Sequence, residues 1–353
     1  MPIFDQGYQH WTGTVSGHAW RWLAITRHGV RVALTNRWLR IALIVSWLPA
    51  LALATMLCLW GLLERQSELI ATLRPLLGFL DPAMLVDPRA HRMEVWTLSY
   101  AYFMLTELRL SMLLILIVGP NLISQDLRYN ALPLYFSRPL RRFDYFLGKW
   151  GVVVAFLGAV TIVPAIVAYV LGLLFSLDLT ILRETFPLLL ASVAYGLMIA
   201  ASAGTLILAL SSLTRNSRYV ALFWLAIWLG ASTVSGILQE VDFAQRQQEH
   251  WRARQGGFNQ EFIDSELKAA RTNWRPLVSY TANLSRLGEE MLGTAAAWDK
   301  LSELRPGGER GGFRLRNLGA QYPWTWSAAV LIGLFGLSTC ILNASIKSLD
   351  RLK

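Results

Sequence analysis

The chain has 353 residues, of which 54% are apolar and only 16% are charged. Soluble globular domains carry about 25% charged residues, so this composition excludes an ordinary soluble domain and indicates a membrane protein. The formal net charge is +10, and because its basic residues follow a membrane topology, as shown below, nucleic-acid binding is not expected.

Residues 20–36 (WRWLAITRHGVRVALTN) predict an amphipathic helix within a cytoplasmic N-terminal segment, 1–40. The apolar side holds Trp22, Leu23, Val30, Ala33 and Leu34, and the polar side holds Arg21, Arg27, His28, Arg31 and Thr35. Trp20 and Ile25 fall off the apolar side. We expect this helix to lie in the membrane interface with its arginines toward lipid phosphates. The alternative is a basic flank that only orients the first membrane span.

Six apolar runs are long enough to cross a hydrocarbon core, which takes about 20 helical residues. They lie near 41–63, 99–119, 150–174, 186–210, 219–238 and 325–346. No run alternates as a membrane β-strand does, and lipid cannot satisfy free backbone groups, so the runs predict helices. The expected fold is an all-α membrane protein with a single transmembrane domain over 1–353. Pro49 and Pro164 fall inside the first and third runs, where they can kink a helix.

The second run contains two charged residues, Glu107 and Arg109. A charge at mid-membrane costs about 2.5–3.5 kcal/mol on insertion scales, so both side chains should face protein or water. Being two positions apart, they point to different sides of the helix and cannot pair well with each other. We interpret them as part of a transport path or a subunit interface. The alternative is that the helix protrudes outward and both charges lie near the membrane surface.

Basic residues predict the orientation of the spans. With the N-terminus inside, the segments 1–40, 120–149, 211–218 and 347–353 hold fifteen Lys or Arg against four acidic residues. The shorter outside loops, 64–98 and 175–185, hold five basic residues against seven acidic ones. This is the positive-inside pattern, and it predicts that both termini are cytoplasmic.

The outer segment 239–324 has helical patterning of its own. One apolar stripe precedes Pro276 and comprises Ile263, Leu267, Ala270 and Trp274. A second, with heptad-like spacing, comprises Leu284, Leu287, Met291, Trp298 and Leu301. We expect an extra helical outer segment, either a small cap or a pair of interfacial helices, that could bind an extracytoplasmic partner. The glycosylation motif at Asn283 is interpreted as a chance match.

Motifs for catalysis are not found in the sequence. There is no GxxxxGK[ST] phosphate-binding loop, since Gly148-Lys149 is followed by Trp150. The five histidines have no metal-ligand spacing, and no nucleophile or paired-carboxylate motif lies at a plausible membrane face. We therefore expect a non-enzymatic chain with no catalytic residues, metal or cofactor of its own.

The inner loop 120–149 is unusually rich in Arg, Tyr and Pro for a solubilising connection. Three elements follow one another in it: Gly119 with Ile123, Ser124, Asp126 and Arg128; Tyr135, Ser137, Arg138 and Pro139; and Arg142, Asp144, Tyr145, Gly148 and Lys149. This order resembles the signature of ABC-2-type permeases, the membrane subunits of type V ABC exporters. The likeness is dense over about 30 residues, whereas the outer segment is longer than expected for that family.

The resemblance implies a permease subunit of an ATP-driven exporter in a bacterial cytoplasmic (inner) membrane. Two permeases, identical or related, would form the translocation path among membrane lipids, and two copies of a separate P-loop ATPase would bind ATP and Mg beneath them. Loop 120–149 would supply a coupling helix. Ser124 and Asp126 could start it, and Pro133 and Pro139 would end helical stretches. The expected coupling residues are Ser124, Asp126, Arg128, Tyr129, Tyr135, Arg138, Pro139, Arg142, Tyr145 and Lys149.

Two other classes of function stay open at this point. A secondary transporter would use Glu107 as a proton or cation site, but it usually has more intramembrane carboxylates and broken helices than this sequence shows. A membrane scaffold would use the outer segment 239–324 to bind a partner. The arginines of loop 120–149 could also serve only to anchor lipid phosphates. Positive-inside topology, however, requires charge and no Tyr or Pro.

Overall fold

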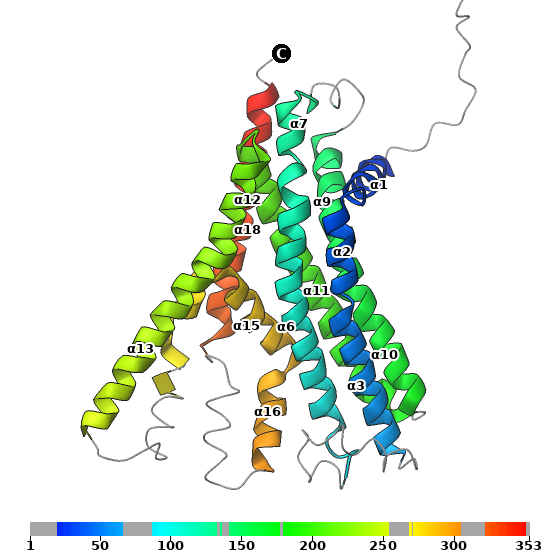
Figure 1. Ribbon diagram of the computed structural model, residues 1–353, viewed down its shortest axis with the longest axis vertical. Coiled ribbons are helices and arrows are strands. Elements are labelled where there is room, and N and C mark those ends of the chain that lie inside the picture. Colours follow the sequence, from blue (N-terminus) through cyan, green and yellow to red (C-terminus); the bar gives the residue numbers. More distant parts are fainter. Residues whose placement is uncertain are drawn as a thin grey trace, which may run out of the picture.

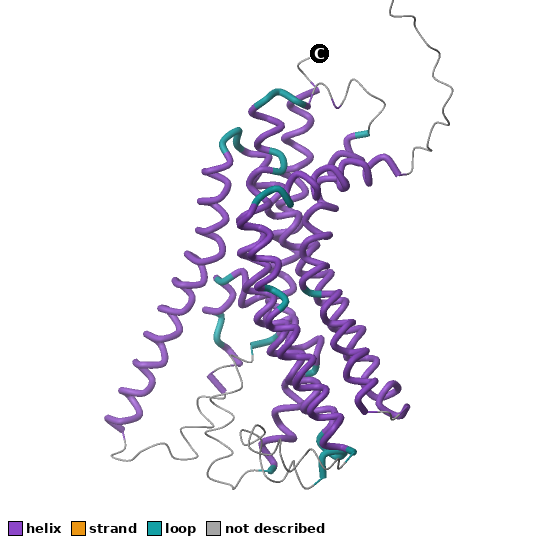
Figure 2. Tube along the Cα trace, turned by 45° about the vertical axis from the view of Figure 1, so that its right-hand side comes forward, coloured by secondary structure: helices purple, strands orange, loops and turns teal. Residues whose placement is uncertain are grey.

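The computed structural model describes residues 20–65, 87–132, 135, 141–176, 179–253, 268–269, 271–304 and 322–350. Every regular element in these ranges is helical (Figure 2). Most helices run along one long axis, whereas α1 (Arg21–Ala33) lies across it, at the same end as α7 (Ser124–Arg128) and the end of α18 (Trp324–Asp350) (Figure 1).

Among the described residues, six helical stretches are long and apolar enough to cross a membrane, in agreement with the predicted number. They are Arg37–Glu64, Arg92–Arg128, Arg142–Ser176, Thr180–Leu213, Ser217–Gln245 and Trp324–Ser345. Their helices are α2 (Arg37–Val45), α3 (Leu48–Glu64), α6 (Arg92–Val118), η3 (Gly119–Asn121), α7, α9 (Arg142–Val160), α10 (Ile162–Ser176), α11 (Leu179–Leu213), α12 (Ser217–Leu225), η4 (Ala226–Gly230), α13 (Ala231–Ala253) and α18.

The first and third spans are both interrupted close to a proline, as predicted. The first breaks at Ser46 and Trp47, so that Pro49 sits in the first turn of α3. The third breaks at Thr161, three residues before Pro164. Proline has no N–H to donate to the preceding turn, and its ring clashes with the carbonyl there, so each helix restarts around it.

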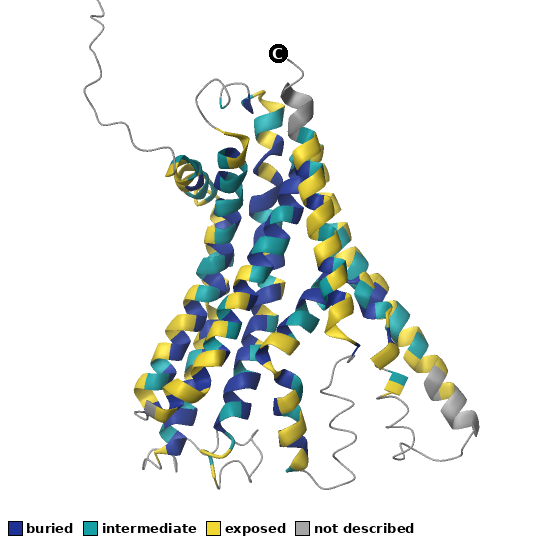
Figure 3. Ribbon diagram, turned by 180° about the vertical axis from the view of Figure 1, so that it is seen from behind, coloured by how far each residue is buried: buried dark blue, intermediate teal, exposed yellow. Residues whose placement is uncertain are grey.

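The second, third and fourth spans form the centre of the molecule. In their most apolar stretches 50%, 50% and 56% of the residues are buried, against 22%, 17% and 22% in the first, fifth and sixth spans. Figure 3 shows the same division between buried centre and exposed outer helices. The outer spans therefore present apolar faces that suit lipid or another protein chain.

Helix α6 begins at Arg92, earlier than the predicted start near 99, because its first charged residues are buried in ion pairs. Arg92 donates to both carboxylate oxygens of Glu64 at 2.9 and 2.6 Å, and to Glu184 at 3.2 Å. Glu94 pairs with Lys300 at 2.8 Å. A hydropathy pattern places such charges outside the membrane span, whereas the fold joins them across four helices.

Helix α1 confirms the predicted amphipathic helix, but its packing face is different. The hydroxyl of Thr26 donates to the Gly148 carbonyl of α9 at 2.9 Å. A Cβ atom on Gly148 would lie 2.6 Å from the Cβ of Ile25, so only glycine permits this approach. Ile25 was not assigned to the apolar side from the sequence pattern, but it is part of the contact between α1 and α9. Arg27 and Arg31 are exposed, as predicted.

The described part of the outer segment is helical, as predicted, but its helices pack on the bundle and do not form a separate cap. Helix α15 (Tyr280–Leu292) packs against α6, α11 and α18, and α16 (Thr294–Glu303) packs against α6. Figure 1 shows α15 at mid-height between the splayed α13 and α6. Three helices of the bundle thus enclose a helix whose sequence is only moderately apolar, and a one-dimensional pattern cannot anticipate this.

The predicted stripe in this segment is partly wrong. Gly293 adopts φ 70 and separates α15 from α16, so one continuous heptad pattern cannot form. Leu292 is buried in place of Met291, which is exposed. Asn283 is fully buried and donates to the Leu277 and Ser279 carbonyls at 2.8 Å each, in keeping with a chance glycosylation motif. In the first stripe, Ile263, Leu267 and Ala270 lie outside the described residues.

Candidate functional site

The end of the second span turns into α7 through a buried serine cluster. The hydroxyl of Ser211, from α11, accepts hydrogen bonds from the backbone N–H groups of Ile123 and Ser124 at 3.0 Å each. Ser124 is the first residue of α7 and is fully buried, with its own hydroxyl on the Pro120 carbonyl and 2.8 Å from the Ser217 hydroxyl. Another helix thus satisfies free donors at the start of α7, which anchors it to the fourth and fifth spans.

Asp126 joins α7 to α9. One of its carboxylate oxygens accepts from the Tyr145 hydroxyl at 2.7 Å and lies 2.7 Å from the Lys149 ammonium. Lys149 also lies over the Tyr145 ring at 5.6 Å, and the Tyr135 ring packs 5.4 Å from the same tyrosine. Charge-assisted hydrogen bonds are stronger than neutral ones, and these side chains are largely shielded from water. We call Asp126, Tyr145 and Lys149 the clamp.

Other predicted coupling residues point outward. Tyr129 is 72% exposed, and the Arg128 guanidinium lies 5.7 Å from its ring. Arg142, at the first turn of α9, is also exposed. Helix α7 ends at Arg128, and Asn130 takes φ 50, a conformation that asparagine tolerates better than most residues. Arg138, Pro139 and Pro133 lie outside the described residues.

Sequence reasoning missed four residues on this surface. Phe143 is 70% exposed beside Arg142, although an aromatic residue in an apolar sequence gives no sign of pointing outward. Arg215, Asn216 and Arg218, from the turn between α11 and α12, line a surface hollow together with Arg128, and no acidic residue lines it. In the sequence, Arg215 and Arg218 indicated only which side of the membrane this turn faces. We call Arg128, Tyr129, Arg142 and Phe143 the docking patch.

The two charged residues of α6 have opposite environments. Glu107 is 0% exposed, and neither of its carboxylate oxygens has a hydrogen-bond partner among the described residues; the Ser111 hydroxyl, one turn further, is likewise buried without one. Arg109 is exposed, which agrees with the predicted divergence of the two side chains. Glu107 lies 15 residues beyond Arg92, which is about 22 Å along the helix. Both charges therefore lie deep along the span.

The exposed side of α6 carries a polar stripe around Arg109. Tyr102, Thr106, Arg109 and Leu113 are all exposed and follow the i, i+4, i+7, i+11 spacing of one helix face. This stripe extends along the middle of the second span.

Within the residues that the structure describes, no three His, Cys, Asp or Glu side chains gather as metal ligands. At the α7–α9 corner Asp126 and Lys149 are paired in the clamp, Asp144 accepts a hydrogen bond from the Arg141 backbone N–H at 3.1 Å, and Arg128 and Arg142 are exposed. This geometry can transmit a force and bind a protein surface.

Comparison with known families agrees with the signature in loop 120–149. The sequence model of a family described as "ABC-2 family transporter protein" matches residues 23–337. A search of curated proteins returns no match.

Proposed function

This chain belongs to the ABC-2 family of transporter proteins, a multi-pass membrane component of transport, and we propose that it is a permease driven by a separate ATPase. The observation that carries this proposal is the clamp between Asp126, Tyr145 and Lys149. It joins the end of the second span to the start of the third, next to exposed aromatic and Arg side chains.

The corner can act as a rigid lever. The docking patch takes residues from both α7 and α9, so a partner that binds it contacts both spans at once. The clamp and the hydrogen bonds of Ser211 to the start of α7 hold this helix in place. A force on the docking patch would therefore move the two spans together and not merely bend a loop. Rigid-body tilting of this kind is an established route to alternating access.

The driving chemistry belongs to the proposed partner. The sequence has no P-loop, so ATP and Mg would bind the ATPase, two copies of which would attach to a pair of permeases. A bacterial cytoplasmic (inner) membrane, with both termini cytoplasmic, is part of the same proposal. The positive-inside count supports this orientation.

The stripe on α6 is the proposed path or the contact with a second permease. An exposed arginine at this depth is strongly disfavoured against lipid, by about 2.5–3.5 kcal/mol on insertion scales. Arg109 therefore suits a water-filled path or a second protein chain better than a lipid-facing surface. Tyr102 and Thr106, on the same face, add polar groups to it.

The alternatives have less support. Glu107 is completely buried, which gives an ion no access in this conformation and disfavours secondary transport through that residue. Helices α15 and α16 pack on their own bundle, so much of their surface is not free for the partner that a scaffold role requires. An extracytoplasmic partner of segment 239–324 stays a prediction.

Co-purification tests the proposal directly. The chain is expressed in its native host and captured in mild detergent, and the bound proteins are identified and quantified. We expect a P-loop ATPase at about one copy per permease. Capture of the intact permease with no such ATPase would contradict the proposal.

A further inference from the structure

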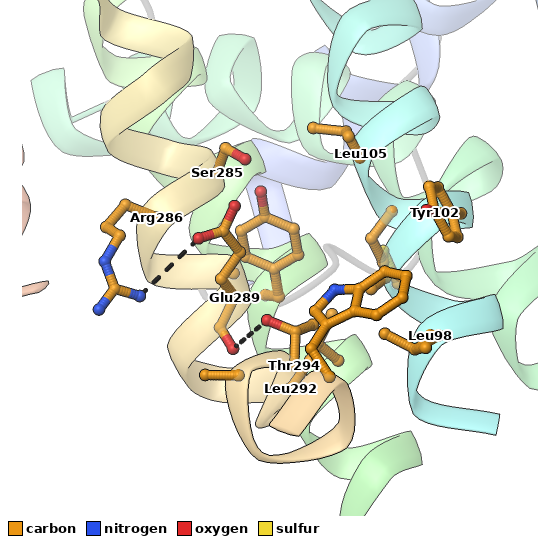
Figure 4. A pocket seen from close by; sticks show the side chains of 14 residues that line it. Leu98, Tyr102, Leu105, Ser285, Arg286, Glu289, Leu292 and Thr294 are labelled. Carbon is orange, nitrogen blue, oxygen red and sulfur yellow. Dashed lines mark hydrogen bonds and ion pairs between the residues drawn. The ribbon is translucent and has the colours of Figure 1, made fainter. Parts of the chain in front are cut away.

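A pocket of about 140 Å³ opens between α6, α11 and the α15–α16 pair. A single water needs roughly 10–15 Å³ on this measure, so the pocket has room for a small organic group. Figure 4 shows α15 and α16 on one side and α6 on the other, with side chains converging between them. The function proposed above makes no use of this pocket.

Aromatic rings form its walls. The Trp298 ring of α16 and the Tyr102 ring of α6 lie 6.4 Å apart with their planes at 90°. Both rings line the pocket, and their perpendicular planes give it aromatic walls in two directions. Tyr195, from α11, lies against Gly288, where a Cβ atom would come within 2.5 Å of the ring. Ring faces are electron-rich, and such aromatic walls bind ammonium groups.

The polar wall adds a negative charge. Glu289 lines the pocket, and its side chain is 42% exposed. Its nearest cation, Arg286, lies 3.8 Å from it, but the same guanidinium lies 3.4 Å from Glu290 and donates to the Tyr322 carbonyl at 2.9 Å. Arg286 also lines the pocket, but its guanidinium is shared among Glu289, Glu290 and the Tyr322 carbonyl, and its side chain extends away from the rings (Figure 4).

We propose that this pocket binds the ammonium group of an amphiphile, with the Tyr102–Trp298 corner around the cation and Glu289 as its counter-ion. Leu98, Leu105 and Leu292 also line the pocket and suit an apolar body next to the charged group. Carboxylate and ring faces together select a cation over a neutral molecule of the same shape.

The position of the pocket relates it to the α6 stripe. Tyr102 belongs both to the pocket wall and to the exposed face that carries Thr106 and Arg109. An amphiphile in the pocket would therefore lie beside the surface proposed as path or subunit contact. Ligand binding itself does not depend on ATPase coupling, so the two proposals can fail separately.

The test measures binding of radiolabelled benzyltrimethylammonium to the purified permease in nanodiscs of phosphatidylglycerol, without any ATPase. Choline and its neutral carbon isostere, 3,3-dimethyl-1-butanol, serve as competitors. Glu289→Gln keeps the shape and removes the charge, and Trp298→Leu removes one ring. Glu290→Gln is the matched control, because it changes the same net charge on the same helix but does not line the pocket.

We expect Glu289→Gln to weaken binding about tenfold or more, Trp298→Leu about fivefold, and Glu290→Gln less than about twofold, with choline a far better competitor than its isostere. Equal effects of Glu289→Gln and Glu290→Gln, or equal competition by the two competitors, would overturn the proposal. A monodisperse elution profile for each variant separates loss of binding from loss of folding.

A second arm identifies the source of the ammonium group. Nanodiscs that contain phosphatidylethanolamine place a lipid ammonium next to the protein. Probe binding that is weaker in these discs than in phosphatidylglycerol discs supports a lipid headgroup as occupant. The Glu289→Gln variant should then show no difference between the two kinds of disc. Unchanged probe binding supports a soluble amphiphile. ATPase co-purification with the Glu289→Gln variant reports separately on the proposed coupling.

Discussion

The Tyr145 hydroxyl donates a 2.7 Å hydrogen bond to the carboxylate of Asp126, 19 residues earlier in the chain. The same carboxylate oxygen pairs with Lys149, so one acidic side chain connects two membrane spans. Residues that look like surface anchors in the sequence thus have an internal partner each.

The clamp predicts that its members contribute non-additively to stability. Asp126→Ala leaves Lys149 and the Tyr145 hydroxyl without their acceptor, and should lower the free energy of unfolding by about 1–3 kcal/mol. Lys149→Ala on its own should also destabilise the protein, and the double variant should be less destabilised than the sum of the two. Thermal unfolding in detergent measures all three. Additive effects would show that the pair does not interact in solution.

The docking patch predicts a separable effect on partner binding. Tyr129→Ala and Phe143→Ala remove exposed aromatic side chains, so folding should be unchanged, while the amount of co-purified ATPase should fall at least about fivefold for the pair, as loss of interface anchors does. Trp274→Ala, which removes an exposed aromatic side chain from the outer segment, is the control. The same ATPase yield from the double variant and the control would rule out this patch as the docking surface.

For Tyr135→Ala we expect weaker ATPase binding through lost packing on Tyr145, and for Arg138→Ala we expect weaker ATPase binding through lost charge.

Arg109 predicts water or protein contact in the middle of the second span. In a variant whose Cys58 and Cys340 are replaced by serine, Arg109→Cys should react with a charged, membrane-impermeant thiol reagent or cross-link to a second copy. Ile332→Cys, on the exposed apolar face of α18, is the control for the reagent and should not react with it, because neither lipid nor an apolar protein contact admits water. An Arg109→Cys variant that neither reacts with the reagent nor cross-links would show that the Arg109 face of α6 lies against lipid.

Glu107 allows a simpler test. Substitution by Gln keeps the side-chain volume and removes the ionisable group, and we expect impaired transport-coupled ATPase activity or impaired assembly with the partner. The structural basis is a buried carboxyl whose oxygens have no partner among the described residues. Wild-type behaviour in both assays would leave Glu107 without a functional role.

The ammonium site predicts a pH dependence. Burial raises the pKa of the Glu289 carboxyl above its usual range, although Arg286 and the Ser285 hydroxyl act in the opposite direction. The ionised carboxylate binds the cation, so affinity for benzyltrimethylammonium should fall as pH is lowered through this raised pKa, above the value of about 4.3 expected of an exposed glutamate. Glu290 and Arg286 face the same region, so the control is Glu289→Gln, whose binding should change little over this range. A wild-type profile that matches the variant's would exclude Glu289 as the counter-ion.

Much of the fold could be predicted from the sequence, because the signals are local. The six apolar runs and the amphipathic N-terminal stretch are each a pattern within about 20 neighbouring residues, and they form the expected helices. The two prolines lie close to the interruptions of the first and third spans. The sequence-based predictions of helix ends and packing faces were wrong where residues distant in the sequence determine them. Arg92 starts α6 early because Glu64 neutralises it, and Ile25 packs on α9 because Gly148 leaves space for it.

The candidate site was predictable only in part, for the same reason. The order of Asp126, Tyr145 and Lys149 in loop 120–149 directed attention to this segment, but no sequence pattern tells a side chain that binds its own protein from one that binds a partner. The insertion of α15 into the bundle was not predictable either. Its moderate hydropathy suits a membrane surface as well as a buried position, and packing against three helices decides between them.

The contact of α1 with Gly148 has a mechanical consequence. One turn of α9 is held on one side by Asp126 through Lys149 and on the other by a helix suited to the membrane surface. A change in bilayer thickness or lateral pressure would shift α1, and through it the resting tilt of the third span. In the permease proposed above, the lipid composition of the membrane would then set the force needed to tilt this span.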